Sequence, residues 1–308
     1  MKRIALFGGT GFVGSYLVDA LVEAGMAPVA LVRPGHEARL RHPDHCEMVP
    51  GDVENAETVD AVLRNADAAI YNIGLLREFP SRGITFEAMH YEAPVRIMQA
   101  AEGAGVRRFV LMSANGVRAE GTAYQVTKFK AEEYLKQTRL DWTVFRPSVI
   151  FGDPRGRNEF ATQLARDVVV PPLPAPLFFD RMAFWKAGEF ALSPVHVTDV
   201  AQAFVQSLAR PDLHGRTLPL GGPQALSWRE ILRIIADALG RRKMMLPVPA
   251  AGVSGAAALL DRFESFPLTR DQLKMLLEGN ICSDEAFSQF GIAAKPFDSA
   301  HLGYLKNL

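Results

Sequence analysis

A glycine-rich turn between an apolar strand and an amphipathic helix constrains this chain more than any other stretch. Residues 4–7 are Ile-Ala-Leu-Phe, residues 8–14 are Gly-Gly-Thr-Gly-Phe-Val-Gly, and a helical pattern follows to residue 22. The glycines satisfy both G-x-G-x-x-G and the looser G-x-x-G-x-x-G. Glycine lets the backbone turn tightly and approach a pyrophosphate, and the next helix directs unpaired N–H groups at the phosphates. The stretch predicts a dinucleotide-binding loop. The alternative is a tight turn in a fold that binds no nucleotide.

The residue after the second strand predicts which dinucleotide is preferred. Residues 28–32, Pro-Val-Ala-Leu-Val, form an apolar run that ends at Arg33. An acidic residue at this position holds the ribose 2′-OH of NAD, whereas an arginine suits the 2′-phosphate of NADP. His36 and Arg39 add positive character in the next turn or two. We therefore expect NADP(H) to be preferred over NAD(H), with a solvated arginine at the strand end as the alternative.

Strand and helix patterns alternate through the first half of the chain. This rhythm predicts an α/β fold, a doubly wound parallel Rossmann sheet with a smaller, mainly helical C-terminal lobe. We assign residues 1–152 to the NAD(P)-binding domain, with returning elements at about 193–222. Residues 153–192 and 223–308 then form a small lobe for a substrate or partner. The first of these segments is rich in proline and aromatic residues, which fits a lid over a substrate and an irregular packing loop equally well.

A tyrosine and a lysine four residues apart form the main candidate for chemistry. Tyr124 and Lys128 lie within a helical pattern over residues 122–138, so they share one helix face. A neighbouring ammonium lowers the pKa of a phenol from its reference value of about 10. The pair could then donate or accept a proton beside a hydride acceptor. A pair exposed on the helix surface is the alternative. His196, further along, is expected to be structural.

Composition restricts the partners and the compartment. Lys and Arg together number 34, as do Asp and Glu, so no net charge draws the chain to nucleic acid. Cys46 and Cys282 lack metal-ligand spacing, and no other metal cluster is evident, which suggests a reduced, cytoplasmic protein without a signal peptide. Residues 244–260 are apolar but short for a membrane span and contain Pro247 and Pro249. We expect a buried strand end followed by a packed helix there, with an interfacial membrane element as the alternative, and we do not expect membrane association.

These motifs together resemble the extended short-chain dehydrogenase/reductase superfamily over the whole length of the chain. Within it, the chain is most similar to the atypical branch that contains the accessory subunit of respiratory complex I and its bacterial relatives. Nucleotide-sugar epimerases and dehydratases are more distant. The resemblance implies a dinucleotide cofactor and a partner in a membrane complex. Besides the glycine loop and the Tyr124/Lys128 pair, the matching features are His90, Ser113-Ala114, Arg146-Pro147, Val197-x-Asp199-Val200-Ala201, Leu220-Gly221-Gly222-Pro223 and Pro267-Leu268-Thr269-Arg270-Asp271-Gln272-Leu273.

The resemblance also implies a role for each site residue. Lys128 would bind the nicotinamide ribose, Tyr124 would stand at the nicotinamide, and Ser113 would join them as a catalytic residue. Arg33 would hold the 2′-phosphate. The remaining cofactor contacts are Gly8, Thr10, Gly11, Phe12, Val13 and Gly14 at the pyrophosphate, Asp52 and Val53 at the adenine, Ile73 and Gly74 on the ribose side, and Pro147 to Ile150 at the carboxamide.

One departure from the family pattern bears on function. Epimerases and dehydratases usually carry a Ser or Thr one residue after the position of Ser113, and this chain has Ala114. Asn115 or Ser113 would have to replace the missing hydroxyl. We therefore expect either an NADP(H)-dependent reductase of a small apolar carbonyl or quinone-type substrate, or a protein that holds the cofactor structurally. The sequence leaves turnover itself open. The alternative is a nucleoside-diphosphate-sugar epimerase or dehydratase. The sequence shows no evident uridine-diphosphate signature, which weakens this alternative.

Overall fold

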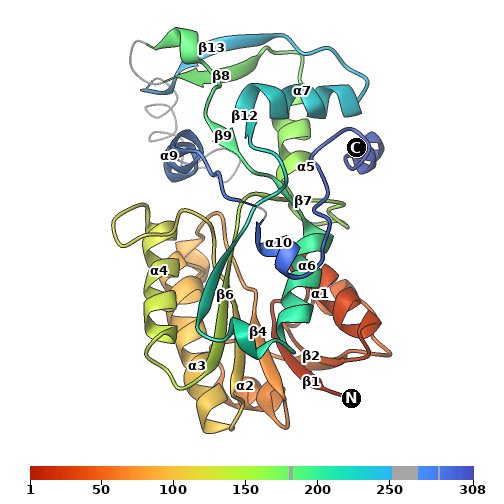
Figure 1. Cartoon of the computed structure of the whole chain (residues 1–308), viewed down its shortest axis with the longest axis vertical. Coiled ribbons are helices and arrows are strands. Elements are labelled where there is room, and N and C mark those ends of the chain that lie inside the picture. The colour runs from red at the N-terminus through yellow and green to blue at the C-terminus, as the bar shows by residue number, and fades with distance from the viewer. Residues whose placement is uncertain (180–182, 252–269, 284) are drawn as a thin grey trace. The chain divides into compact units, whose positions relative to one another are not determined.

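The computed structural model describes residues 1–179, 183–251, 270–283 and 285–308, which form two compact units (Figure 1). The first unit contains Met1–Pro147, Val197–Pro219 and Ala286–Ile292. The second contains Ser148–His196, Leu220–Glu285 and Ala293–Leu308. Each unit is therefore assembled from three separate stretches of the chain.

The first unit is built on a seven-stranded sheet. In spatial order its strands are β11 (Arg216–Leu220), β6 (Asp141–Pro147), β5 (Arg108–Met112), β4 (Ala68–Tyr71), β1 (Arg3–Phe7), β2 (Ala27–Val32) and β3 (Glu47–Pro50). The pairings from β6 through to β3 are all parallel. The strand order reverses between β1 and β4, and such a switch point opens a crevice at the carboxyl ends of the strands. The predicted Rossmann sheet is confirmed.

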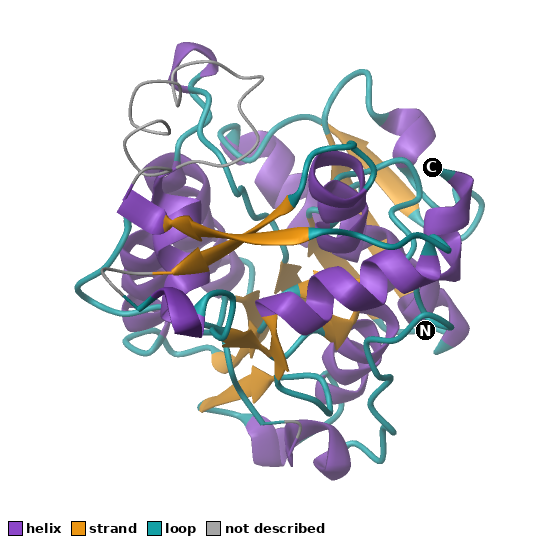
Figure 2. Cartoon of the chain, turned by 90° about the horizontal axis from the view of Figure 1, so that it is seen from above, coloured by secondary structure: helices purple, strands orange, loops and turns teal. Residues whose placement is uncertain are grey.

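Helices cover both faces of this sheet (Figures 1 and 2). On one face, α2 (Ala56–Leu63), α3 (Ala93–Gly103) and α4 (Ala123–Leu135) pack in sequence, while α1 (Phe12–Glu23) packs against α6 (Val197–Ser207) on the other. Strands buried on both faces are apolar throughout rather than alternating. In β1, Ala5 and Phe7 join the core under α2 and α3, and Ile4 and Leu6 are equally buried. The short elements of this unit are η1 (Glu37–Arg39), η2 (Pro80–Arg82), η3 (Glu87–Glu92), η6 (Pro211–Leu213) and most of α10 (Glu285–Gln289).

The helical segment over residues 87–103 has two different parts. Its first part, η3, is a π-helix, and only from Ala93 does the chain continue as the α-helix α3. Pro94 lies in the first turn of α3, where its missing N–H is tolerated. The hydroxyl of Tyr71, at the end of β4, donates to the carbonyl of Met89 in η3 at 2.5 Å. This bond ties η3 to the end of the central sheet.

The second unit combines helices with three two-stranded sheets. Its core packs α7 (Trp228–Ala238) against residues such as Phe151 and Leu192. Ser227 and Glu230 form a capping box at the start of α7. The sheets pair β7 (Ile150–Phe151) with β10 (Val195–His196), β9 (Ala191–Leu192) with β12 (Leu226–Ser227), and β8 (Ala175–Phe179) with β13 (Met245–Pro249). The other elements are α5 (Phe160–Leu164), η4 (Ala165–Val169), η5 (Phe184–Lys186), α9 (Arg270–Glu278) and η7 (Gly303–Asn307).

The apolar stretch 244–260 differs from its expected structure. Its first part forms the strand β13, but this strand is not buried, and the Leu246 side chain is 48% exposed. The reason is that β13 pairs only with β8, in a sheet of two strands. The expected packed helix lies largely outside the described residues, as do Pro267 to Thr269. Within the described ranges, none of the helices is long and apolar enough to cross a bilayer.

Candidate functional site

The glycines of the turn after β1 serve different purposes. Gly8 has a left-handed φ of +102°. A Cβ added at Gly14 would lie 2.0 Å from the Gly8 carbonyl oxygen, so the contact of α1 with the turn requires glycine there. A Cβ at Gly11 would meet only that same oxygen, at 3.3 Å, and the Gly11 φ of −73° suits any residue. The fold of the chain itself therefore explains Gly8 and Gly14, whereas at Gly11 it sets only one tight contact, with a backbone oxygen.

The first turn of α1 offers an anion site beside Gly11. Gly11 is the N-cap residue, no side chain caps the helix, and the first turn carries no acidic residue. The free N–H groups and the helix dipole favour a negative charge at such an end. Thr10, Phe12 and Val13 are partly buried around it. The exposed Gly11 and the helix end beside it, without a side-chain cap from the N-cap residue, fit a pyrophosphate.

The carboxyl end of β2 is positively charged. Arg33 and Arg39 are both exposed, and burial followed by repulsion from these two arginines lowers the pKa of His36. One carboxylate is nearby, because Glu37 accepts a hydrogen bond from the Gly35 N–H at 3.0 Å. No acidic side chain occupies the position directly after β2, where NAD sites carry one.

The predicted adenine and ribose residues follow the neighbouring strands. Asp52 comes after β3 and accepts a hydrogen bond from the Glu54 N–H at 3.2 Å, and the next residue, Val53, is buried. Ile73 and Gly74 come after β4. The segment after β4 touches the glycine turn, since a Cβ at Gly8 would lie 3.0 Å from the Asn72 carbonyl carbon. Because β3, β2, β1 and β4 are parallel neighbours, these residues share one edge of the sheet.

Lys128 reaches this edge from α4. A capping box of Thr122 and Gln125, which the sequence analysis missed, starts the helix. The Lys128 ammonium donates to the Met112 carbonyl at the end of β5 at 3.1 Å, and it lies 3.9 Å from where a Gly74 Cβ would be. It therefore lies at the ends of both β5 and β4. Burial lowers the pKa of Lys128 to about 8, and the nearby Glu132 carboxylate opposes this shift.

The structure corrects one expectation about Tyr124. Burial raises the pKa of its phenol, and Lys128 does not lower it. The physical reason is placement: the ammonium lies 5.7 Å from the centre of the Tyr124 ring and donates to a backbone carbonyl. The ring is enclosed edge-on by Phe86 and His90, at centroid distances of 5.8 and 5.1 Å. Tyr124 therefore keeps its proton at neutral pH.

His90 is held in one protonation state beside this pair. It lies in η3, is 2% exposed, and its Nε2 accepts a hydrogen bond from the Leu75 N–H at 2.9 Å. An accepting Nε2 places the ring proton on Nδ1. That Nδ1 is buried and has no partner among the described residues. Burial, with repulsion from Lys128, lowers the pKa of His90 to about 2, so the ring is neutral.

Ser113 and the residues near Pro147 complete the predicted set. Ser113 follows β5, its N–H donates to the Phe145 carbonyl at 2.8 Å, and its buried hydroxyl has no partner in the described part of the chain. Pro147 ends β6 in the first unit. Ile150 begins β7 in the second unit, where it pairs with Val195. His196, in β10, packs edge-on against Phe151 at 5.0 Å.

A buried ion pair supports α4 and was not predicted. Glu132 is fully buried, and its carboxylate accepts two hydrogen bonds from Arg146 in β6, at 2.6 and 2.9 Å. Glu132 is four residues after Lys128, so it fixes the same helix to the sheet one turn further along. The Arg146-Pro147 motif was visible in the sequence, but its partner was not.

Comparison with known proteins identifies a nucleotide-binding family and relatives that agree with it. A model of the NAD(P)H-binding family matches residues 8–168. The chain is 24% identical to the mitochondrial NADH-ubiquinone oxidoreductase 40 kDa subunit of Neurospora crassa, over 97% of this chain and 77% of that protein. It is 27% identical to the ceramide reductase of Caulobacter vibrioides, over 86% of this chain and 80% of the relative.

A solved structure shares the fold. MoeE5 in complex with UDP-glucuronic acid and NAD superposes with a TM-score of 0.74 at 21% identity, covering 100% of this chain and 99% of that one. The predicted resemblance to the atypical dehydrogenase/reductases and complex I subunits is confirmed, as is NAD(P) binding as a family property.

Proposed function

The chain belongs to the NAD(P)H-binding family, and we propose that it binds NADP(H) and reduces a small apolar carbonyl or quinone-type substrate. The observation that supports NADP(H) binding is the contrast between Gly11 and Gly14 within the glycine turn. Gly14 is required by contacts inside the protein, whereas a Cβ at the exposed Gly11 would make a single tight contact, 3.3 Å from a backbone oxygen, at the start of α1. A glycine that the fold requires less strictly, at a position that a pyrophosphate would need, supports a ligand there.

The preference for NADP(H) rests on the charge after β2. Arg33, with Arg39 and His36, offers cations and a hydrogen-bond donor to a 2′-phosphate, and Glu37 directs its carboxylate to the Gly35 N–H. Arginine suits phosphate oxygens because its planar guanidinium forms two parallel hydrogen bonds. Asp52, Val53, Ile73 and Gly74 would then line the rest of the dinucleotide along the sheet edge.

Tyr124 would supply the proton of a reduction. When bound, the dinucleotide supplies a hydride. Reduction of a carbonyl also needs a proton, and the Tyr124 phenol carries one at neutral pH. Lys128, at the ends of β4 and β5, would hold the nicotinamide ribose and orient the site. The buried hydroxyl of Ser113, which has no hydrogen-bond partner among the residues that the structure describes, offers a further hydrogen bond. Pro147 and Ile150 would flank the carboxamide.

The substrate class is inferred from what surrounds the Tyr124 ring. Phe86 and a neutral His90 enclose it, and no carboxylate that would bind a sugar hydroxyl is among these neighbours. The similarity to a ceramide reductase also supports an apolar substrate. The thiols of Cys46 and Cys282 are free, which fits a reduced compartment such as the cytoplasm.

A second candidate is a protein that holds the cofactor without turnover, on a larger complex. Ala114 favours it, because the hydroxyl that typically holds a substrate oxygen is missing there. The likeness to a 40 kDa subunit of an oxidoreductase complex supports it as well. The epimerase alternative has less support, since the same hydroxyl is missing and the similarity to MoeE5 concerns the fold alone.

Two substitutions distinguish the candidates. If the protein is a reductase, Tyr124→Phe lowers NADPH oxidation by about a hundredfold or more and leaves NADPH affinity nearly unchanged. Lys128→Met lowers both. The measurement is NADPH consumption with a panel of carbonyls, quinones and nucleotide sugars, beside calorimetric titration of NADPH. If the unaltered protein binds NADPH but shows no rate that depends on Tyr124, the reductase is excluded and the structural candidate stands.

A further inference from the structure

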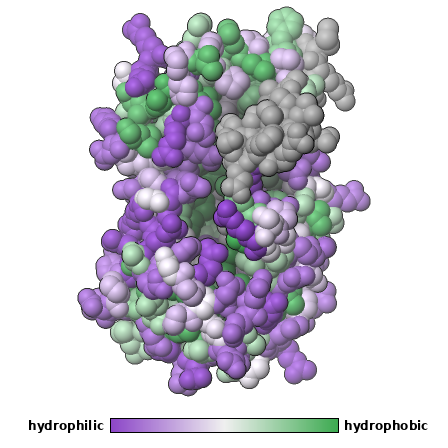
Figure 3. Space-filling model, turned by 180° about the vertical axis from the view of Figure 1, so that it is seen from behind, coloured by the Kyte–Doolittle hydropathy of each residue, from purple (hydrophilic) through white to green (hydrophobic). Residues whose placement is uncertain are grey.

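Exposed apolar side chains gather on one surface of the second unit. Eleven large apolar side chains are exposed among the described residues, and six of them lie within residues 170–173, 184–185 and 244–246. They are Val170 (38%), Leu173 (72%), Phe184 (62%), Trp185 (64%), Met244 (65%) and Leu246 (48%). Isolated exposed apolar residues are ordinary, but a contiguous patch marks an interaction site. Figure 3 shows, for one face of the molecule, green apolar groups within a mainly hydrophilic surface.

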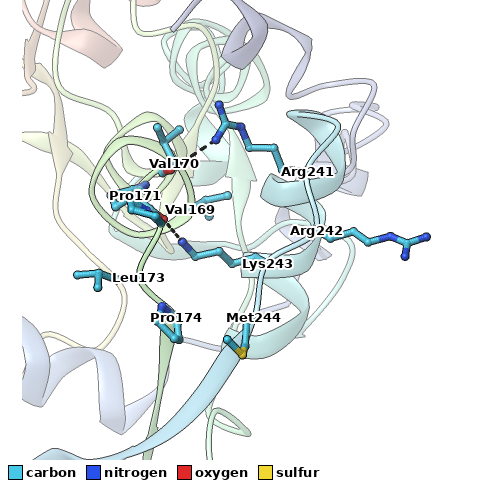
Figure 4. Close-up of a pocket in the computed structure, with 10 residues that line it drawn as sticks. Val169, Val170, Pro171, Leu173, Pro174, Arg241, Arg242, Lys243 and Met244 are labelled. Carbon is cyan, nitrogen blue, oxygen red and sulfur yellow. Dashed lines mark hydrogen bonds between the residues drawn. The ribbon is translucent and has the colours of Figure 1, made fainter.

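These side chains belong to adjoining segments. A cavity of about 330 Å³ is lined by residues 169–174 on one side and 241–244 on the other (Figure 4). Strand β13 continues from Met245 and pairs with β8, and η5 contacts β13. The η5 segment lies toward the other end of this strand pair, because the N–H of Gly188 donates to the carbonyl of Phe178, which pairs with Val248. The rings of Phe184 and Trp185 meet edge to face at 5.3 Å. We call the surface formed by residues 169–174, 184–186 and 241–246 the apolar-basic surface.

The charges on this surface are all of one sign. Its three segments carry Lys186, Arg241, Arg242 and Lys243, and no Asp or Glu. Arg241 and Lys243 donate to the carbonyls of Val170 and Pro171, which fixes both cations at the cavity. Arg242 points away from the cavity (Figure 4). The chain as a whole has no net charge, so this is a local concentration of positive charge.

We propose that the apolar-basic surface docks the protein on a lipid bilayer that contains anionic lipids. Trp, Phe and Leu side chains insert at the boundary between headgroups and acyl chains, while Lys and Arg remain among the anionic headgroups. A second copy of the chain fits this surface poorly, because each copy would bring four cations to a shared interface without a carboxylate. The charge pattern complements a membrane surface instead.

This proposal replaces the expectation that the chain does not associate with membranes. That expectation relied on the stretch 244–260 being too short and too rich in proline to span a bilayer. Lying on a bilayer requires neither length nor a continuous helix. It requires exposed apolar area next to cations, and β13, with η5 and the loop before β8, provides both.

Sedimentation with vesicles tests the proposal on the full chain. We expect binding to phosphatidylcholine vesicles that contain phosphatidylglycerol, weaker binding to phosphatidylcholine alone, and a loss of binding as salt is raised. Arg242→Gln should lower the partition coefficient about fivefold, since one basic residue near an anionic surface contributes about 1 kcal/mol. Leu173→Ser should lower it roughly tenfold by removing an inserted side chain. Arg64→Gln, an exposed arginine of the first unit, is the matched control and should change nothing.

Tryptophan fluorescence locates the contact. Trp185 is 64% exposed, whereas Trp228 is 2% exposed. Anionic vesicles should shift the emission to the blue, and Trp185→Phe should abolish that shift. Equal behaviour of Arg242→Gln and Arg64→Gln, no preference for anionic vesicles, or a blue shift that persists in Trp185→Phe would each overturn the proposal. So would a dimer in solution that Leu173→Ser converts to a monomer, because the surface would then join two copies of the chain.

Discussion

Replacing Gly11 by valine should abolish cofactor binding and leave the protein folded. In the structure a Cβ at this position approaches one atom, the Gly8 carbonyl oxygen at 3.3 Å, and the backbone φ of −73° is ordinary. An N-cap glycine differs from a non-capping residue by only about 1 kcal/mol. For a chain of this size that corresponds to a change in melting temperature of roughly 2–4 °C. The valine methyl groups would fill the open side of the turn.

The loss of affinity can be worked out from the bonds that the methyl groups would block. Each hydrogen bond from a backbone N–H to a charged oxygen contributes about 1.5–3 kcal/mol. Losing two of them at the α1 N-terminus weakens binding by about 3–6 kcal/mol, roughly a factor of 10² to 10⁴. Calorimetric titration of NADPH and thermal melting followed by circular dichroism measure the two quantities separately.

Gly14→Ala is the matched comparison. Its Cβ would lie 2.0 Å from the Gly8 carbonyl oxygen and 2.8 Å from the Gly9 Cα, so the backbone must move. We therefore expect Gly14→Ala to lower the free energy of unfolding even in the absence of NADPH. If Gly11→Val unfolds the protein, or binds NADPH with unchanged affinity, the assignment of the glycine turn as a pyrophosphate site is refuted.

Three further outcomes are expected. Arg33→Asp should remove a roughly ten- to hundredfold preference for NADPH over NADH, and tighter binding of NADH by the unaltered protein in the same titration would contradict the role of Arg33. NADPH affinity should fall as pH rises through about 8, where Lys128 loses its proton. Unfolding stability should rise between that pH and about 10.4, the ordinary lysine pKa, because the unfolded chain then binds the extra proton; neither trend should survive in Lys128→Met. Arg146→Met should lower the free energy of unfolding by roughly 3–5 kcal/mol by leaving the buried Glu132 carboxylate unpaired, and adding Glu132→Gln should restore part of it in urea titrations.

Local sequence patterns predicted those parts of the fold that depend on neighbours along the chain. The strand, glycine turn and helix at the N-terminus are present, as is the helix that carries Tyr124 and Lys128. In each case the signal, a hydrophobic period or a motif spacing, comes from residues close together in sequence.

The features that sequence did not predict depend on contacts across the fold. The π-helix η3 is tied to Tyr71 across 18 residues, and no local pattern encodes that bond. The pKa of Tyr124 depends on how deeply its ring is buried, and a spacing of four residues does not report burial. Strand β13 is exposed because its sheet has one other strand. The positions of Lys128 and His90 relative to the strand ends likewise depend on how the helices pack on the sheet.

The interleaving of the two units has a consequence for how the protein is made on the ribosome. The sheet of the first unit is incomplete until β11 has been synthesised, about two-thirds of the way along the chain, and Phe290 still packs on Phe145 of that unit. Arg108, in β5, donates to the carbonyl of Ser207, 99 residues later. A nascent chain that ends at Pro147 would therefore expose an unfinished sheet edge and would lack one of the hydrogen-bond acceptors of the buried Arg108 side chain. The first unit therefore receives its last stretch only after residues 148–196 and 220–285 of the second unit have been synthesised.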